Sequence, residues 1–193
     1  GDKGDPGLDA VGVCPDGVLA GSYSILNARD VADIAGCSSI TGDLTVRRAV
    51  GLVTVSLPEL TAVGGHLTVD GSNELTTLSL PGLTMIGGRL NVVINTALTV
   101  LSLPVLTTVE ADLRFDGNDA LTTLSLPALT TVGGDLDVEE STALTTLSLP
   151  ALTTFEGNIQ IGYNPALTTL SLPVLATVGT DLSVDSNPAL TTL

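Results

Sequence analysis

Few residues in this sequence could do chemistry. There are two cysteines, Cys14 and Cys37, and one histidine, His66, which lies far in sequence from both of them. We find no Ser-His-Asp set, no cysteine spacing typical of zinc and no phosphate-binding loop. We therefore predict that the protein is not an enzyme, and we expect His66 to be a solvated surface residue.

Charged residues gather in two neighbouring copies of a recurring Asp-Leu-x-Val stretch. Variable polar positions on a uniform repeat protein are where such proteins usually bind, and crowded carboxylate oxygens could hold calcium, the one cofactor we consider. The alternative is that these charges only keep an open sheet soluble. The candidate ligand-binding residues are Asp112, Arg114, Asp116, Asp135, Asp137 and Glu139, and the candidate calcium ligands are Asp116, Asp135, Asp137 and Glu139.

A repeat of 23 residues must position these side chains. A Ser-Leu-Pro triplet marks it, with the serine at Ser56, Ser79, Ser102, Ser125, Ser148 and Ser171. A fixed period of this length indicates a solenoid. We expect about seven turns, because the repeat runs to the end of the sequence.

Each copy has seven apolar positions that we predict to face inward. In one copy they are Leu75, Leu78, Leu80, Leu83, Ile86, Leu90 and Val92. The apolar and polar residues alternate as in half-buried strands, and Pro81 and the Gly87-Gly88 pair leave no room for a helix. The sequence predicts an all-β solenoid, a single-stranded parallel β-helix with three short strands per turn, stacked about 4.8 Å apart.

Two further sets of polar residues recur with the same period. One is a column at a corner, expected to satisfy backbone groups there, formed by Asn95, Asn118, Asn164 and Asn187 with Ser72 and Ser141. The other is a flat face with two hydroxyls per turn, formed by Thr77/Ser79, Thr123/Ser125, Thr146/Ser148 and Thr169/Ser171, which Val100 interrupts. This second face is similar to ice-binding solenoids.

Residues 13–40 lack the period and are predicted to form an N-terminal cap. Asn27 can begin a short helix through Ala28 to Ile34, with Gly36 ending it, and this helix would cover the open edge of the first turn. Cys14 and Cys37 bracket the helix, which suggests a disulfide; two free buried thiols are the alternative. A disulfide would place the protein in an oxidising compartment.

Residues 1–12 are predicted to be a collagen-like tail or a glycine-rich linker. Gly1 to Asp9 reads as three Gly-X-Y triplets, the spacing that lets three chains meet at one axis, so trimerisation through a stalk is one expected mode of association. The sequence begins without Met and stops within a copy at Leu193. We therefore expect it to be a piece of a longer protein, with residues 41–193 forming the repeats.

Composition excludes several classes of partner. The net charge of −15 argues against nucleic acid and anionic membranes, which require clustered Lys and Arg. No apolar run is long enough to span a membrane. Aromatic residues make up only 2% of the chain, so an aromatic ligand cage is not expected.

The cap and the repeats together resemble a known family. The stretches VCPDG and ILNARDVADIAGCSSITGDLTV are similar to the opening of the receptor L domain of the insulin and epidermal growth factor receptors, and Leu129 to Val138 resembles that family's coils. The resemblance covers residues 13–193. It implies a right-handed, leucine-rich-repeat-like β-helix, a cap with a Cys14–Cys37 bridge and an extracellular location. The near-uniform copies and the lack of a second cysteine-bonded cap depart from the family, so no ligand-binding residues carry over.

Two classes of function fit these features, with a third more remote. We expect a structural or adhesive rod, secreted or on the cell surface, that associates with itself in fibres or filaments. The alternative is a receptor-like module that binds a ligand through the acidic Asp-Leu-x-Val face. An ice-binding solenoid is the third.

Overall fold

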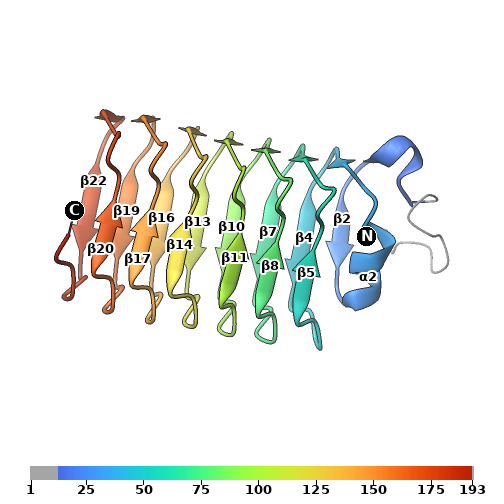
Figure 1. Cartoon of the computed structure of the whole chain (residues 1–193), viewed down its shortest axis with the longest axis horizontal. Helices are drawn as coiled ribbons and strands as arrows, with labels where there is room; N and C mark the ends of the chain where they lie inside the picture. The colour runs from blue at the N-terminus through green and yellow to red at the C-terminus, as the bar shows by residue number, and fades with distance from the viewer. Residues whose placement is uncertain (1–12, 193) are drawn as a thin grey trace.

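The computed structural model describes residues 13–192, which form a parallel β-solenoid (Figure 1). The turns stand side by side along the long axis of the molecule, and the short helix α2 lies at the N-terminal end. Gly1 to Asp9, the predicted collagen-like triplets, lie outside the described residues. The predicted 23-residue turn and the all-β fold are confirmed.

Three rows of parallel strands run along the solenoid, one for each strand of the predicted turn. The longest row is an eight-stranded sheet of β2 (Tyr23–Ile25), β4 (Leu44–Arg47), β7 (Leu67–Asp70), β10 (Leu90–Val93), β13 (Leu113–Asp116), β16 (Leu136–Glu139), β19 (Ile159–Gly162) and β22 (Leu182–Asp185). The second row holds β1 (Val18–Leu19), β3 (Ser39–Ile40), β6 (Ala62–Val63), β9 (Met85–Ile86), β12 (Thr108–Val109), β15 (Thr131–Val132), β18 (Thr154–Phe155) and β21 (Thr177–Val178). The third row holds β5 (Thr54–Ser56), β8 (Thr77–Ser79), β11 (Val100–Ser102), β14 (Thr123–Ser125), β17 (Thr146–Ser148) and β20 (Thr169–Ser171).

The second and third rows are each interrupted once. The hydrogen-bonded ladder stops between β15 and β18 in the second row and between β11 and β14 in the third. Each gap is near a phenylalanine at an inward position that holds Val or Ile in most turns: Phe155 in β18, and Phe115 in β13, the strand of the first row that lies in sequence between β11 and β14. A ring needs more volume than an aliphatic side chain, and backbone shifts relieve such overpacking.

The seven inward positions form one continuous core. Leu75, Leu78, Leu80, Leu83, Ile86, Leu90 and Val92 are all buried, as predicted. The predicted corner column is also confirmed, because Asn95, Asn118 and Asn164 are fully buried. Their Oδ1 atoms accept hydrogen bonds from backbone N–H groups of the neighbouring turn, and their Nδ2 groups donate to backbone carbonyl oxygens there. The column supplies polar partners at a corner where the sheet ladder ends.

The predicted cap helix is present as α2 (Ala28–Asp33), one residue shorter than expected. Asn27 begins it with a capping box, in which its side chain accepts from the backbone of Asp30 and the Asp30 side chain accepts from the backbone of Asn27. The helix ends at Asp33 with Ile34 as its C-cap residue, before Gly36, which was expected to end it. It packs beside β2 and β5, at the start of the third row.

The cap is also part of the coil, which the sequence pattern did not indicate. Strands β1 and β2 pair in parallel with β3 and β4, and the single-turn 3-10 helix η1 (Pro15–Gly17) precedes them. Their partners lie 21 residues on, for example Leu19 opposite Ile40, instead of 23. This two-residue difference hides the first turn from a search for the period.

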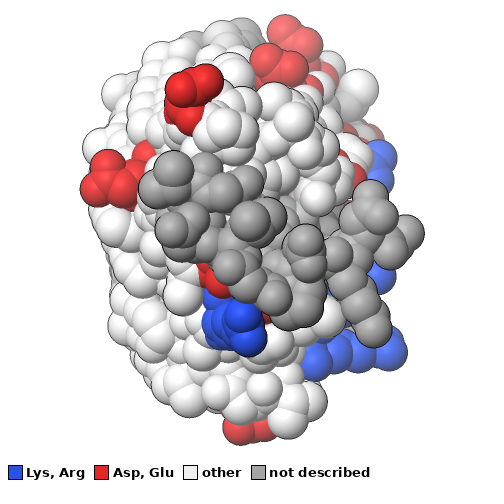
Figure 2. Space-filling model, turned by 90° about the vertical axis from the view of Figure 1, so that its right-hand side faces the viewer, with Lys and Arg blue, Asp and Glu red and all other residues white. Residues whose placement is uncertain are grey.

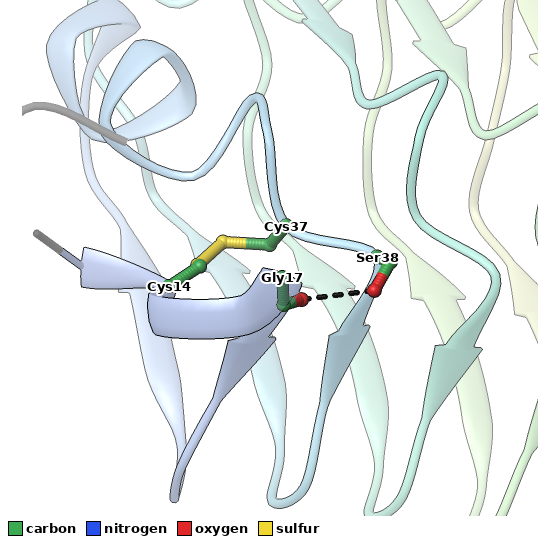
Figure 3. Close-up of a disulfide and its surroundings, with 4 residues drawn as sticks. All are labelled: Cys14, Gly17, Cys37 and Ser38. Carbon is green, nitrogen blue, oxygen red and sulfur yellow. Dashed lines mark hydrogen bonds between the residues drawn. A yellow bond between two sulfur atoms is a disulfide. The ribbon is translucent and has the colours of Figure 1, made fainter. Parts of the chain in front are cut away.

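A disulfide joins Cys14 to Cys37, as predicted, with 5.5 Å between the Cα atoms (Figure 3). Beside it, the Ser38 hydroxyl donates a hydrogen bond of 3.0 Å to the carbonyl oxygen of Gly17. The two cysteines are 23 residues apart and occupy the repeat position that Leu60 fills in the next turn. The bridge therefore covalently links two successive layers of the inner column.

Candidate functional site

The predicted ligand-binding residues lie together on the outer face of the eight-stranded sheet. Asp112 precedes β13 and Asp135 precedes β16, and the other four residues lie on these two strands. The strands are adjacent and in register, with Arg114 opposite Asp137 and Asp116 opposite Glu139. These six residues therefore share one face of the sheet, and that they bind a ligand stays a prediction.

The same face contains a depression of about 230 Å³ that extends toward the N-terminal turns. Three arginines line it, Arg47, Arg89 and Arg114, although the sequence analysis singled out only Arg114. They come from different turns and from three different positions of the repeat, Arg89 just before its strand and the other two within theirs, so the period alone does not show that they meet. Figure 2 looks along the coil from the end that carries α2, and the basic atoms visible there lie in the lower and right-hand parts of the outline.

Each of the three arginines is paired with a carboxylate. Arg47 Nε lies 3.0 Å from Asp70 Oδ2, and Arg89 Nε lies 2.9 Å from Asp112 Oδ2. The third pair joins Arg114 Nη2 to Asp116 Oδ2 at 2.8 Å. The arginine side chains are more than half exposed, so each pair contributes little to stability and mainly fixes the guanidinium groups.

The side chain just before β4, β7, β13 and β16 has a structural task that the sequence pattern did not indicate. Asp43 Oδ1 accepts a 2.7 Å hydrogen bond from the backbone N–H of His66, and His66 Nδ1 accepts one of 2.9 Å from Arg89. Asp112 and Asp135 likewise accept from the residue 23 positions on. His66 is exposed, as predicted, but its ring also links two turns. We call this set the acceptor column: Asp43, His66, Asp112, Asp135.

The acceptor column explains one glycine in the corner that follows each of its members. A Cβ built on Gly65 would contact Asp43 Oδ1, and one on Gly134 would contact Asp112 Oδ1, both far inside normal contact distance. The equivalent residue after Arg89, which cannot accept a hydrogen bond, is Ala111. After Asn158 the equivalent residue is Thr180, whose hydroxyl donates to Asn158 Oδ1. The exchange of Gly for Ala after Arg89 is the sequence signal that could have revealed the column.

Asp137 is the exception among the carboxylates of the depression, because no side-chain hydrogen bond or ion pair involves it within residues 13–192. Partial burial raises its pKa, Arg114 lowers it, and the charges of Glu139, Asp135 and Asp112 raise it further. The net effect is a raised pKa. A cation placed beside Asp137 would therefore stabilise its charged form.

Three of the four predicted calcium ligands are already engaged. Asp116 pairs with Arg114, Asp135 accepts from Asn158, and Glu139 Oε1 accepts from Gln160 Nε2 at 2.7 Å. Nowhere in residues 13–192 do three His, Cys, Asp or Glu side chains come together as a metal site would require. Calcium binding stays a prediction, and the arrangement gives it no support.

The Thr and Ser face lies on the third row, with Thr123 opposite Thr146 and Ser125 opposite Ser148. Val100 takes the threonine position in β11, and the ladder gap between β11 and β14 divides the array into two three-stranded pieces. Other threonines serve the backbone: the Thr84 hydroxyl, for example, donates to the carbonyl oxygen of Thr61. The regular hydroxyl array is therefore shorter than the sequence suggested.

No helix within residues 13–192 is long and apolar enough to cross a membrane. Comparisons with protein-family models, with curated proteins and with solved structures found no match. The parallel solenoid is compatible with the β-helix that the resemblance to receptor L domains implies.

Proposed function

We propose that this protein is a non-enzymatic structural or adhesive module, a rigid repeat rod that acts outside the cell and associates with copies of itself. The observation that carries the proposal is the continuity of the coil. Strands from Tyr23 to Asp185 form one parallel sheet, and one hydrophobic core runs through all the turns beneath it.

Contacts between neighbouring turns account for the rigidity. The backbone is bonded from turn to turn along the strand rows, and the corner column and the acceptor column add side-chain bonds between residues 23 apart. In a repeat architecture of this kind, each turn is stabilised mainly by its neighbours. Stiffness along the coil axis follows, because bending would have to break several columns of bonds together.

The surface and the disulfide favour an extracellular structural role. Specific protein interfaces rely on aromatic and Arg anchors, and the chain has two Tyr, two Phe and no Trp, with both phenylalanines buried. The Cys14–Cys37 bridge suits an oxidising compartment. The charge of −15 makes nucleic acid an unfavourable partner.

Labelling of intact cells of the source organism tests this proposal. We expect an antibody against the folded coil to label the surface of unpermeabilised cells, and immunogold electron microscopy to place the label on fibres or on a continuous layer. Labelling that requires permeabilisation would contradict the extracellular role. Label spread over the surface as isolated points would contradict self-association.

A further inference from the structure

The depression on the eight-stranded sheet brings together basic side chains in an acidic protein. The whole chain has six Lys and Arg residues, and three of them, Arg47, Arg89 and Arg114, line this one depression. Isolated basic residues on an acidic surface need no explanation beyond solubility. A depression of about 230 Å³ that holds half of all the cationic side chains does need a further explanation.

The guanidinium groups are held in place with donors to spare. Arg47 and Arg89 each use Nε to reach a carboxylate, and Arg114 uses Nη2. A guanidinium group has five N–H donors. Each arginine therefore keeps several donors for a ligand, while its partner carboxylate reduces the conformational entropy that binding would cost.

Between the arginines lie short polar side chains. Thr68 and Asn91 are partly buried and line the depression, yet neither side chain takes part in a hydrogen bond within residues 13–192. Val93 is the apolar residue of the lining. The depression therefore has polar groups that are free to hydrogen-bond a small polar ligand. It has little apolar surface for an apolar ligand.

Charges around the depression have both signs. The three arginines are balanced by the carboxylates that they contact, and Asp137 is left over as a carboxylate without a partner in the described chain. Arg114 and Asp137 are register partners on neighbouring strands, which are about 4.8 Å apart. Arg114, which has bonded Asp116 through one of its five N–H groups, and Asp137, which has no partner in residues 13–192, thus lie side by side at one end of the depression.

We propose that this depression binds a small zwitterion, a molecule whose carboxylate and ammonium groups are attached to the same carbon atom, as in an α-amino acid. The carboxylate is bound by the free N–H groups of Arg89 and Arg114, and the ammonium group by Asp137. A carboxylate ligand alone would leave Asp137 unpaired among other carboxylates. The volume is below the roughly 300 Å³ typical of sites for drug-sized molecules, so the ligand is small.

This site is independent of the rod proposal, because a rod can carry a ligand site on one face without using that face for assembly. Glycine is a suitable probe, since it has both charged groups and no side chain. Acetate and methylammonium each carry one of the two groups. The readout is the NMR signal of the Asn91 side-chain amide during titration, with backbone signals reporting that each variant is folded.

We expect glycine to shift the Asn91 signal in a saturable way below about 10 mM, and acetate or methylammonium to bind at least about tenfold more weakly. Asp137→Asn and Arg114→Gln should each weaken glycine binding by at least about tenfold, since each removes a charged partner. Asp185→Asn, on the same sheet but outside the depression, should not change it. A response to acetate as strong as that to glycine, unchanged binding in Asp137→Asn, or no saturable shift would overturn the proposal.

Discussion

The Nδ1 atom of His66 accepts a hydrogen bond of 2.9 Å from the backbone N–H of Arg89, one full turn further along the coil. A histidine thus fills a place in the acceptor column that aspartate takes at Asp43 and Asp112. All of these side chains serve the backbone of the next turn. Variation within the column is therefore limited to residues whose side chain can accept a hydrogen bond, with Arg89 as the exception.

Removing the acceptor at His66 should destabilise the coil. We expect His66→Ala to lower the free energy of unfolding by about 1 kcal/mol, because the Arg89 N–H would lose its partner. His66→Asp is the matched control and should keep most of the stability, since Asp43 and Asp112 make the same bond. Urea denaturation of both variants measures the difference. Equal stability of His66→Ala and the parent protein would show that the bond contributes nothing.

The glycine that follows each acceptor should tolerate no side chain. A Cβ at residue 134 would contact Asp112 Oδ1 and lie 2.7 Å from the Asp112 backbone nitrogen, so we expect Gly134→Ala to cost about 1–3 kcal/mol. The control is Ala111→Gly, at the equivalent position after Arg89, which should cost less than about 1 kcal/mol. Thermal unfolding of the two variants measures the difference in stability. A Gly134→Ala protein as stable as Ala111→Gly would refute the close approach.

Much of this fold could be predicted because the repeat is written at a single period. The inward leucines, the corner column that includes Asn95, and the helix begun by Asn27 are each visible within one copy or by stacking copies at the same position. Each of these contacts joins a residue to the equivalent residue of a neighbouring copy, 23 positions away. Contacts of that kind follow directly from the alignment of copies.

Features that join different positions of the repeat could not be predicted in this way. The acceptor column couples Asp112 to the glycine at 134, 22 residues on, and the depression brings together arginines from three different positions of the repeat. The first turn was missed because its strands are offset by 21 residues. Such relationships depend on where side chains point and on how closely backbone segments pack, and the repeat period predicts neither.

Asp137 should make stability depend on pH in a specific direction. Its pKa is raised in the folded protein, first by partial burial, so folding disfavours its charged form at neutral pH. This penalty is absent below the ordinary Asp pKa of about 3.9 and appears as the pH rises through the raised value. We expect Asp137→Asn to melt at a higher temperature than the parent protein near pH 7, with the difference vanishing near pH 3. A lower melting temperature at pH 7 would contradict the direction of the shift.

The disulfide should protect the N-terminal turns more than the rest of the coil. It closes a loop of 23 residues, for which the expected stabilisation is about 3 kcal/mol. In the double variant Cys14→Ser/Cys37→Ser, we expect faster amide hydrogen exchange in β1, β2 and α2, and unchanged exchange in β16, which serves as the internal control. Free thiols in the native protein, or uniform exchange changes along the coil, would contradict this account.

Electron microscopy of native material tests the central claim most directly. If the protein is a structural rod that associates with itself, images should show fibres or extended rods, with the strands perpendicular to the long axis and an axial spacing of about 4.8 Å between turns. Dispersed single particles that do not associate, whatever ligand they bind on the eight-stranded sheet, would contradict the claim.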